Sequence, residues 1–253
     1  MTGRVFDISE LTVHDGDGSR LTVFMKGCKM RCEWCHNPEG LSFEKQLLFR
    51  RKKCVHCGLC KKKCNHEECK PFGRCLKVCP NNCLEICGKD YTARELAKTI
   101  NEYKPVFDAL GGGVTFSGGE PLLQWEFISE TIDLCKGINF ALETAGYVPS
   151  DIFKAAVEKT DYVFMDIKIF DCAEHEKYTG VKNDLIKENF MTLKNSGKPY
   201  TVRTPLIKGF TDDEKNLSAI KDFIGDSPWE KIPENKLAKA KYEMLSLNDG
   251  YTL

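Results

Sequence analysis

The distribution of cysteines limits how this chain can fold more than any other feature of the sequence. Twelve of the fourteen cysteines lie between residues 28 and 87, and only Cys135 and Cys172 lie elsewhere. No signal peptide is evident, so we expect a cytoplasmic protein, and the cytoplasm keeps thiols reduced. The crowded cysteines are therefore predicted to bind metal rather than to form disulfides. Cys135 and Cys172 are predicted to be small, partly buried apolar residues.

Size and charge argue against several functions. The 253 residues, 42% of them hydrophobic, are enough for one sizeable core and a small satellite domain. The 37 basic and 37 acidic side chains cancel, so the net charge indicates neither a nucleic-acid-binding nor a membrane-binding surface. No apolar run approaches the roughly 18 residues that span a bilayer. We expect a monomer that binds neither nucleic acid nor membrane.

Three cysteines stand close together in the segment GCKMRCEWCHNPEG, with the spacing C-x3-C-x2-C. A four-iron cluster normally takes four cysteine ligands, so Cys28, Cys32 and Cys35 would leave one iron open to a small molecule. A zinc ion completed by His36 is the alternative, but His36 adjoins Cys35 and cannot easily face the same ion. The loop therefore predicts a cluster that takes part in chemistry rather than one that only stores metal.

Outside the cysteine-rich part, short β-branched or aromatic runs alternate with longer helical patterns. Candidate strands lie near residues 20, 113, 140, 163, 201 and 230, and candidate helices cover 92–103, 121–136, 150–158, 184–196 and 212–224. Thr92 and Glu95 have the spacing of a capping box. Six strands are too few for a complete eight-stranded barrel, so we predict an α/β fold, a partial (β/α)6 TIM-like barrel. Its site should lie at the C-terminal ends of the strands.

These motifs resemble those of the radical S-adenosylmethionine (SAM) superfamily. In that family the three-cysteine loop holds a [4Fe-4S] cluster whose open iron binds SAM, and a cluster electron splits SAM into methionine and a 5'-deoxyadenosyl radical. The resemblance assigns further SAM contacts to the segments SGGE, ETAGY, MDIK and IPENK. A strand-to-helix turn is the plain alternative for SGGE, and a solvated strand end for Lys168. The implied cofactor-binding residues are Trp34, His36, Gly118, Gly119, Glu120, Glu143, Thr144, Asp166, Ile167, Lys168 and Asn235.

Two segments together, FDISELTVHDGDGSR and GGGVTFSGGEPLLQ, are similar to the activating enzymes of glycyl radical enzymes. In that family the deoxyadenosyl radical removes a hydrogen atom from one backbone glycine of a partner enzyme. Asp15 or Asp17 would bind backbone amides of the glycine-bearing peptide near the barrel mouth. A glycine-rich turn capped by its own aspartate is the alternative. Asp17 stands where the family often has proline.

Residues 49–90 form a separate cysteine-rich unit between the two parts of the barrel, 1–48 and 91–253. Its first four cysteines have the C-x2-C-x2-C-x3-C spacing of bacterial ferredoxins, whereas zinc ribbons separate their pairs more widely. The unit resembles the ferredoxin-like insert of many activating enzymes, which implies two further [4Fe-4S] clusters and three in all. The ferredoxin pattern gives one cluster to Cys54, Cys57, Cys60 and Cys79, and the other to Cys64, Cys69, Cys75 and either Cys87, which we favour, or Cys83.

Basic residues at 50–53 and 61–63 form either a solvated face or a dock for an acidic electron donor such as flavodoxin or ferredoxin. Two other functions fit parts of the sequence. A pure electron carrier would have no use for the SGGE and MDIK segments. A radical SAM maturase that modifies another peptide or a small molecule usually has its extra clusters after the barrel, and here they interrupt it.

Overall fold

The fold is built on one curved, eight-stranded sheet in a computed structural model that describes residues 1–234 and 238–245. The sheet has the strand order β10-β9-β8-β7-β6-β2-β1-β5. Neighbours from β10 to β2 are parallel, which confirms the predicted partial barrel and all six predicted strands. These strands are β2 (Ser19–Met25), β6 (Gly112–Gly118), β7 (Asn139–Thr144), β8 (Tyr162–Asp166), β9 (Tyr200–Leu206) and β10 (Trp229–Pro233).

Two strands that were not predicted extend the sheet beyond β2. Strand β1 (Thr2–Thr12) runs antiparallel to β2, and β5 (Lys89–Thr92) pairs antiparallel with β1. The segment TGRVFDISELT mixes charged and apolar residues, and most of its side chains are partly or fully exposed. An edge strand of this kind lacks the apolar run that marked the inner strands.

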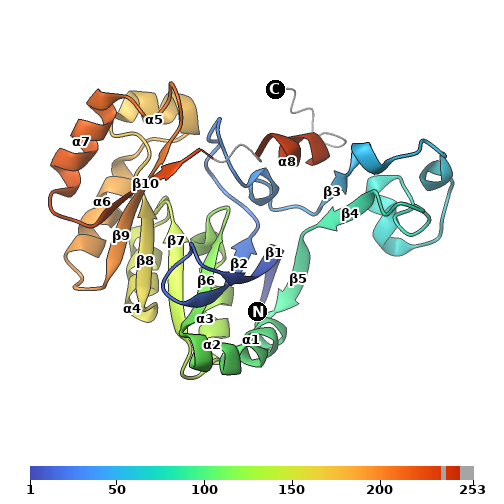
Figure 1. The fold of residues 1–253 in the computed structure, drawn as a ribbon, viewed down its shortest axis with the longest axis horizontal. Coiled ribbons are helices and arrows are strands. Elements are labelled where there is room, and N and C mark those ends of the chain that lie inside the picture. Colours follow the sequence, from blue (N-terminus) through green and yellow to red (C-terminus); the bar gives the residue numbers. More distant parts are fainter. Residues whose placement is uncertain (235–237, 246–253) are drawn as a thin grey trace.

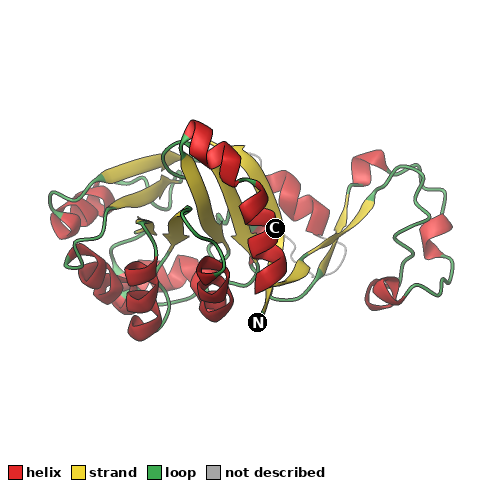
Figure 2. Ribbon diagram, turned by 90° about the horizontal axis from the view of Figure 1, so that it is seen from below, coloured by secondary structure: helices red, strands yellow, loops and turns green. Residues whose placement is uncertain are grey.

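Helices follow the strands as β/α units require, and Figure 2 shows most of them gathered on one side of the curved sheet. Helix α1 (Ala93–Glu102) begins at the predicted capping box, in which Thr92 and Glu95 each bind the other's backbone. The predicted helix at residue 121 begins as a 3-10 turn, η5 (Pro121–Gln124), and continues as α3 (Trp125–Asp133). The other helices are α2 (Lys104–Leu110), α4 (Ser150–Lys159), α5 (Cys172–Thr179), α6 (Asp184–Lys194), α7 (Glu214–Ile224) and α8 (Ala238–Leu245).

The main core lies between the sheet and these helices. Val23, Phe116 and Leu142 from the strands are fully buried, as are Ile128 of α3 and Phe190 of α6. No helix within residues 1–234 and 238–245 is long and apolar enough to cross a membrane.

The cysteine-rich insert projects away from the barrel on a two-stranded stem (Figure 1). The stem pairs β3 (Gln46–Phe49) with β4 (Leu84–Cys87), and Gln46 stands opposite Cys87. Beyond the stem lie only the short 3-10 turns η2 (Arg51–Lys53), η3 (Leu59–Lys61) and η4 (Glu67–Phe72). Lys89 and Asp90, which the sequence analysis assigned to the insert, belong to β5 because they pair with β1 in the main sheet.

Candidate active site

A pocket of about 170 Å³ opens at the C-terminal ends of the parallel strands, where the sequence predicted the site. The three cysteines of the loop after β2 lie in its wall, and Ser117, Ala145 and Ile232 join them from the ends of other strands. Most of the residues expected to bind SAM also line it. They are Trp34, His36, Gly118, Gly119, Glu143, Thr144, Asp166 and Lys168.

Contacts with distant segments hold the three-cysteine loop in place. At its start, Gly27 N donates to Gly40 O over 2.8 Å. At its middle, Arg31 N donates to the carbonyl of Thr179, the last residue of α5, over 2.7 Å. The ring of Trp34 packs 5.3 Å from the ring of Phe210. The loop therefore presents its thiols from a backbone that is fixed on two sides.

The loop and its surroundings fit an iron–sulfur cluster. Burial, and then the nearby Glu120 carboxylate, raise the pKa of the Cys28 thiol to about 12. Burial likewise raises the pKa of Cys35 to about 12. Such thiols stay protonated until a metal displaces the proton. His36 Nε2 is buried at the same pocket with no hydrogen-bond partner among the described residues, which is the state expected of a group that awaits a ligand.

The two glycines of the SGGE segment are required by contacts within the protein. Gly118 has φ +116°, and a Cβ there would lie 2.4 Å from Met25 N. A Cβ on Gly119 would lie 2.4 Å from the carbonyl oxygens of both Gly27 and Gly40. Only glycine lets the end of β6 approach the cysteine loop this closely. The glycines thus position the loop as well as line the pocket.

Glu120 is not among the residues that line the pocket. It is 2% exposed and accepts hydrogen bonds from the Thr144 hydroxyl over 2.6 Å and from Ala145 N over 3.0 Å. Burial raises its pKa to about 7, in spite of these donors. Glu120 therefore ties the end of β6 to the end of β7, and the contact with SAM that the resemblance implied for it remains a prediction.

Glu120 should make stability depend on pH. An acid whose pKa is raised by folding stabilises the fold fully only below its ordinary pKa of 4.5, and this contribution is lost as the pH rises to about 7. Relative to Glu120→Gln, the wild type should lose about 3 kcal/mol over this range. Thermal unfolding of both proteins at a series of pH values measures the difference. Glu126→Gln, at an exposed site on α3, is the control and should show no such trend. Parallel pH profiles for wild type and Glu120→Gln would contradict the assignment.

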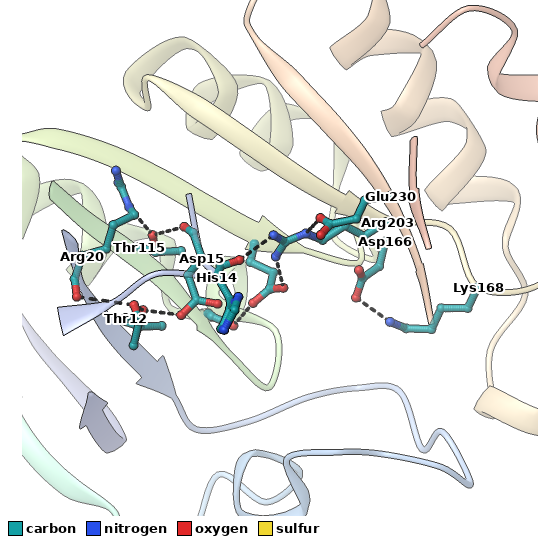
Figure 3. Close-up of polar contacts among 12 residues, drawn as sticks. Thr12, His14, Asp15, Arg20, Thr115, Asp166, Lys168, Arg203 and Glu230 are labelled. Carbon is teal, nitrogen blue, oxygen red and sulfur yellow. Dashed lines mark hydrogen bonds and ion pairs between the residues drawn. The ribbon is translucent and has the colours of Figure 1, made fainter. Parts of the chain in front are cut away.

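Charged side chains form the floor of the pocket. Glu143 Oε1 lies 2.9 Å from Arg203 Nη1, and Ser117 donates to the same carboxylate. Asp166 and Lys168 form a second pair at 2.5 Å. Burial opposes the charge on Lys168, but Asp166 outweighs it and raises the pKa. Figure 3 shows Arg203 and the Asp166–Lys168 pair.

Like Glu120, Ile167 belongs to the predicted set but does not line the pocket. Ile167 is 4% exposed, and its backbone N–H donates to Arg203 O while its carbonyl accepts from the Thr204 hydroxyl. Ile167 therefore connects the end of β8 to β9. Asn235 lies outside the described residues.

The segment HDGDG, between β1 and β2, enters the barrel from the N-terminal ends of the strands. The sequence predicted that this segment lies near the barrel mouth, but the segment precedes β2 whereas the cysteine loop follows β2. Arg203 Nη2 donates to His14 O over 2.8 Å, as Figure 3 shows. The Asp15 carboxylate accepts from the Thr22 hydroxyl over 2.7 Å, and Asp15 O accepts from Thr115.

A second, open cavity of about 740 Å³ lies on this side of the barrel. Asp17, Val13 and His14 line it together with Arg203 and with residues at the starts of β6, β7 and β8. Glu143 lines the first pocket and Arg203 lines the second cavity. The Glu143–Arg203 ion pair therefore separates the two spaces.

The structure divides the predicted cysteine ligands of the insert into two groups and leaves one aside. Cys54, Cys57, Cys60, Cys79 and Cys83 line one small cavity. Cys64, Cys69 and Cys75 gather around His66, which was not predicted as a ligand. Cys87, the favoured eighth ligand, joins neither group because it ends the stem at β4, against Lys26.

Lys26 is fully buried at the junction of barrel and insert. Its Nζ donates to Glu39 O over 2.6 Å and to Gln46 Oε1 over 2.9 Å, and it lies 3.7 Å from Cys87 Sγ. Burial lowers its pKa. The sequence offered a weak signal for Lys26 and for Arg203, since each is a charged residue within or directly after an apolar strand.

Helix α8 packs against β3 and η1 (Pro38–Gly40), close to the cysteine loop. Lys241 Nζ donates to Asn37 Oδ1 over 3.0 Å and lies 3.4 Å from Glu39 Oε1. This helix and its contacts were not predicted, because a local sequence pattern carries no information about a segment some 200 residues away in the chain.

Comparison with known proteins identifies the family. Residues 22–218 match the sequence profile of the Radical SAM superfamily. The chain is 34% identical to the 4-hydroxyphenylacetate decarboxylase activating enzyme of Clostridioides difficile (strain 630), over 100% of this chain and 88% of that protein. It is 35% identical to the trans-4-hydroxy-L-proline dehydratase activating enzyme of Clostridioides difficile, over 97% of this chain and 88% of the relative. It is 34% identical to the choline trimethylamine-lyase activating enzyme of Oleidesulfovibrio alaskensis, over 95% of this chain and 86% of the relative.

Solved structures agree on the fold. Streptococcus suis SuiB bound to precursor peptide SuiA aligns with a TM-score of 0.57 and 12% identity, over 89% of this chain and 41% of that one. QueE from Escherichia coli aligns with a TM-score of 0.51 and 13% identity, over 96% of this chain and 89% of QueE. The relatives that match along nearly the whole chain favour neither an electron carrier nor a maturase. The chain therefore belongs to the radical SAM superfamily, and within it to the glycyl radical enzyme activating enzymes.

Proposed function

We propose that this activase reaches the glycine of its partner from the second cavity and generates the radical in the first. The observation that supports this is the arrangement around Arg203. The cysteine-lined pocket lies on the Glu143 side of the ion pair, and the HDGDG segment and the open cavity lie on the other. SAM and the partner peptide would therefore approach the Glu143–Arg203 pair from opposite sides, without sharing an entrance.

In this proposal Cys28, Cys32 and Cys35 hold the [4Fe-4S] cluster. When bound, the cluster and SAM supply a 5'-deoxyadenosyl radical that takes a hydrogen atom from glycine. The protein binds the polar groups of SAM through His36 Nε2, which lacks a partner, and through the Asp166–Lys168 pair. Trp34 forms part of the pocket wall on the side of the cysteine loop. Glycine suits the reaction because it presents no side chain.

The partner is a glycyl radical enzyme, and the names of the relatives suggest three candidates. These are 4-hydroxyphenylacetate decarboxylase, trans-4-hydroxy-L-proline dehydratase and choline trimethylamine-lyase. Reduced protein should be incubated with SAM and each candidate in turn, and the glycyl doublet recorded by electron paramagnetic resonance. We expect a doublet with one of them. SAM cleavage without a doublet in any would reject these three partners, and no cleavage at all would reject the proposed site.

Asp15 provides a test of how the partner is bound. Its carboxylate is fixed by the Thr22 hydroxyl inside the barrel and can accept backbone amides of an extended peptide, as can Asp17 in the second cavity. Asp15→Ala should slow glycyl radical formation by roughly tenfold, the loss of one charge-assisted hydrogen bond. SAM cleavage without a partner should be unchanged. Asp7→Ala, on β1, is the control. If Asp15→Ala activates the partner at the wild-type rate, the aspartate only caps its own turn.

The insert is proposed to hold an auxiliary [4Fe-4S] cluster on Cys54, Cys57, Cys60 and Cys79, with Cys83 as a spare thiol. The five thiols line one cavity, which supports this set. An acidic donor such as flavodoxin or ferredoxin would dock on the basic residues nearby. Arg50 pairs with Glu85 at 2.6 Å, so residues 51–53 and 61–63 would form the larger part of the dock.

A further inference from the structure

The second cysteine group of the insert contains a histidine and is unusually compact. One ligand atom each from Cys64, His66, Cys69 and Cys75 lie within 4.8 Å of one another. His66 Nδ1 is 3.6 Å from Cys75 Sγ, and Cys69 and Cys75 are buried. In residues 1–234 and 238–245, this is the one group of histidine, cysteine or acidic residues gathered so closely. The three cysteines of the active-site loop do not lie this close to one another.

The local backbone builds this group from both ends of η4. Cys69 N donates to His66 O over 3.1 Å, so a tight turn brings histidine and cysteine to the same side. Leu76 N donates to Cys69 Sγ over 3.3 Å. Cys75 N donates to Cys60 O over 2.8 Å, which ties this group to the neighbouring cysteine group.

The size of the group indicates what it can hold. A tetrahedral zinc ion has sulfur ligands at about 2.3 Å and nitrogen ligands at about 2.0–2.1 Å, which places ligand atoms roughly 3.5–3.8 Å apart. The distance of 3.6 Å between His66 Nδ1 and Cys75 Sγ agrees with this value. A four-iron cluster binds each ligand through a different iron, so its ligand atoms stand farther apart. The compact group therefore matches a single ion and not a cube.

The remaining cysteines offer no better fourth ligand. Cys83 lines the other cavity with Cys54 and Cys79, and Cys87 lies beside Lys26 at the base of the stem. Phe72 occupies the place where a ferredoxin would have the missing cysteine. His66 is the side chain that the fold brings to the other three.

We propose that Cys64, His66, Cys69 and Cys75 bind one zinc ion, so that the insert holds one iron–sulfur cluster and one structural zinc site. Four protein ligands close the coordination sphere and leave no position for substrate, and zinc has no redox chemistry. The ion replaces a core in a segment whose 3-10 turns bury almost no apolar side chains. The sequence predicted a second four-iron cluster here, and this proposal replaces it.

Metal analysis of the whole protein tests the proposal. The protein should be reconstituted without oxygen, with iron, sulfide and zinc all present, so that each site selects its metal. We expect about one zinc and about eight irons per chain, from two four-iron clusters. His66→Ala should lose the zinc and keep its iron, and His66→Cys should keep both because thiolate is also a zinc ligand. The control is His56→Asn, at the other histidine of the insert, which should change neither metal.

A spectroscopic measurement guards against a variant that merely misfolds. Cobalt(II) in place of zinc should give the intense visible absorption of a tetrahedral thiolate site, and in His66→Cys this absorption should shift as a fourth thiolate replaces imidazole. About twelve irons with no zinc would overturn the proposal in favour of a histidine-ligated cluster. Zinc retained in full by His66→Ala would remove His66 from the ligand set.

Discussion

Replacing Cys32 with alanine is expected to abolish the release of methionine and 5'-deoxyadenosine from SAM. Cys32 is one of three half-buried cysteines in the pocket wall, and two thiolates cannot hold a four-iron cluster that already lacks one protein ligand. The variant should lose about four irons while the metals of the insert remain. Chromatography of the two products and iron analysis are the measurements.

The control for this experiment is Cys172→Ala. Cys172 begins α5, outside both the pocket and the insert, and should tolerate replacement with unchanged cleavage and iron content. Unimpaired SAM cleavage by the Cys32→Ala protein would mean that the loop does not hold the reactive cluster.

Replacing Arg203 with methionine is expected to damage both stability and partner activation. The Arg203 side chain is 5% exposed, lies over the Phe164 ring at 3.8 Å, and joins Glu143 to His14 O. Methionine keeps an unbranched apolar stem but removes the guanidinium and leaves the Glu143 carboxylate without its cation, at a cost of about 3–5 kcal/mol. The HDGDG segment would lose an anchor, and misplacement of the peptide beneath the pocket should slow glycyl radical formation roughly 100-fold. Thermal unfolding and the yield of glycyl radical measure the two effects.

Glu230→Gln is the matched control, because Glu230 pairs with the same guanidinium from its outer side. Its side chain is 51% exposed, so the loss of this pair should change stability by less than about 1 kcal/mol. Activation should stay close to the wild-type rate. Equal effects of the two replacements would mean that the Glu143–Arg203 pair has no special role at the floor of the pocket.

Local patterns predicted the parallel strands, the capping box of α1 and the cysteine loop after β2. They did so because apolar runs, cap spacing and ligand spacing depend on residues close together in the chain. These patterns did not predict features that depend on contacts between residues far apart in the chain. The orientation of Glu120 depends on Thr144, the depth of the HDGDG segment on Arg203, and the place of Cys87 on Lys26. His66 was overlooked because the ferredoxin spacing counts cysteines only.

The stem of the insert has a consequence for how such proteins diversify. Gln46 and Cys87 stand opposite each other, and both contact the single buried side chain of Lys26. The chain thus leaves and re-enters the barrel at one point. The forty residues between Gln46 and Cys87 could therefore be gained, exchanged or deleted in evolution as a unit, with the strand order of the main sheet preserved. Selection can then act on the metal content of the insert separately from the radical chemistry. Any exchanged insert would have to keep polar partners for the buried Lys26 ammonium group at the base of the stem.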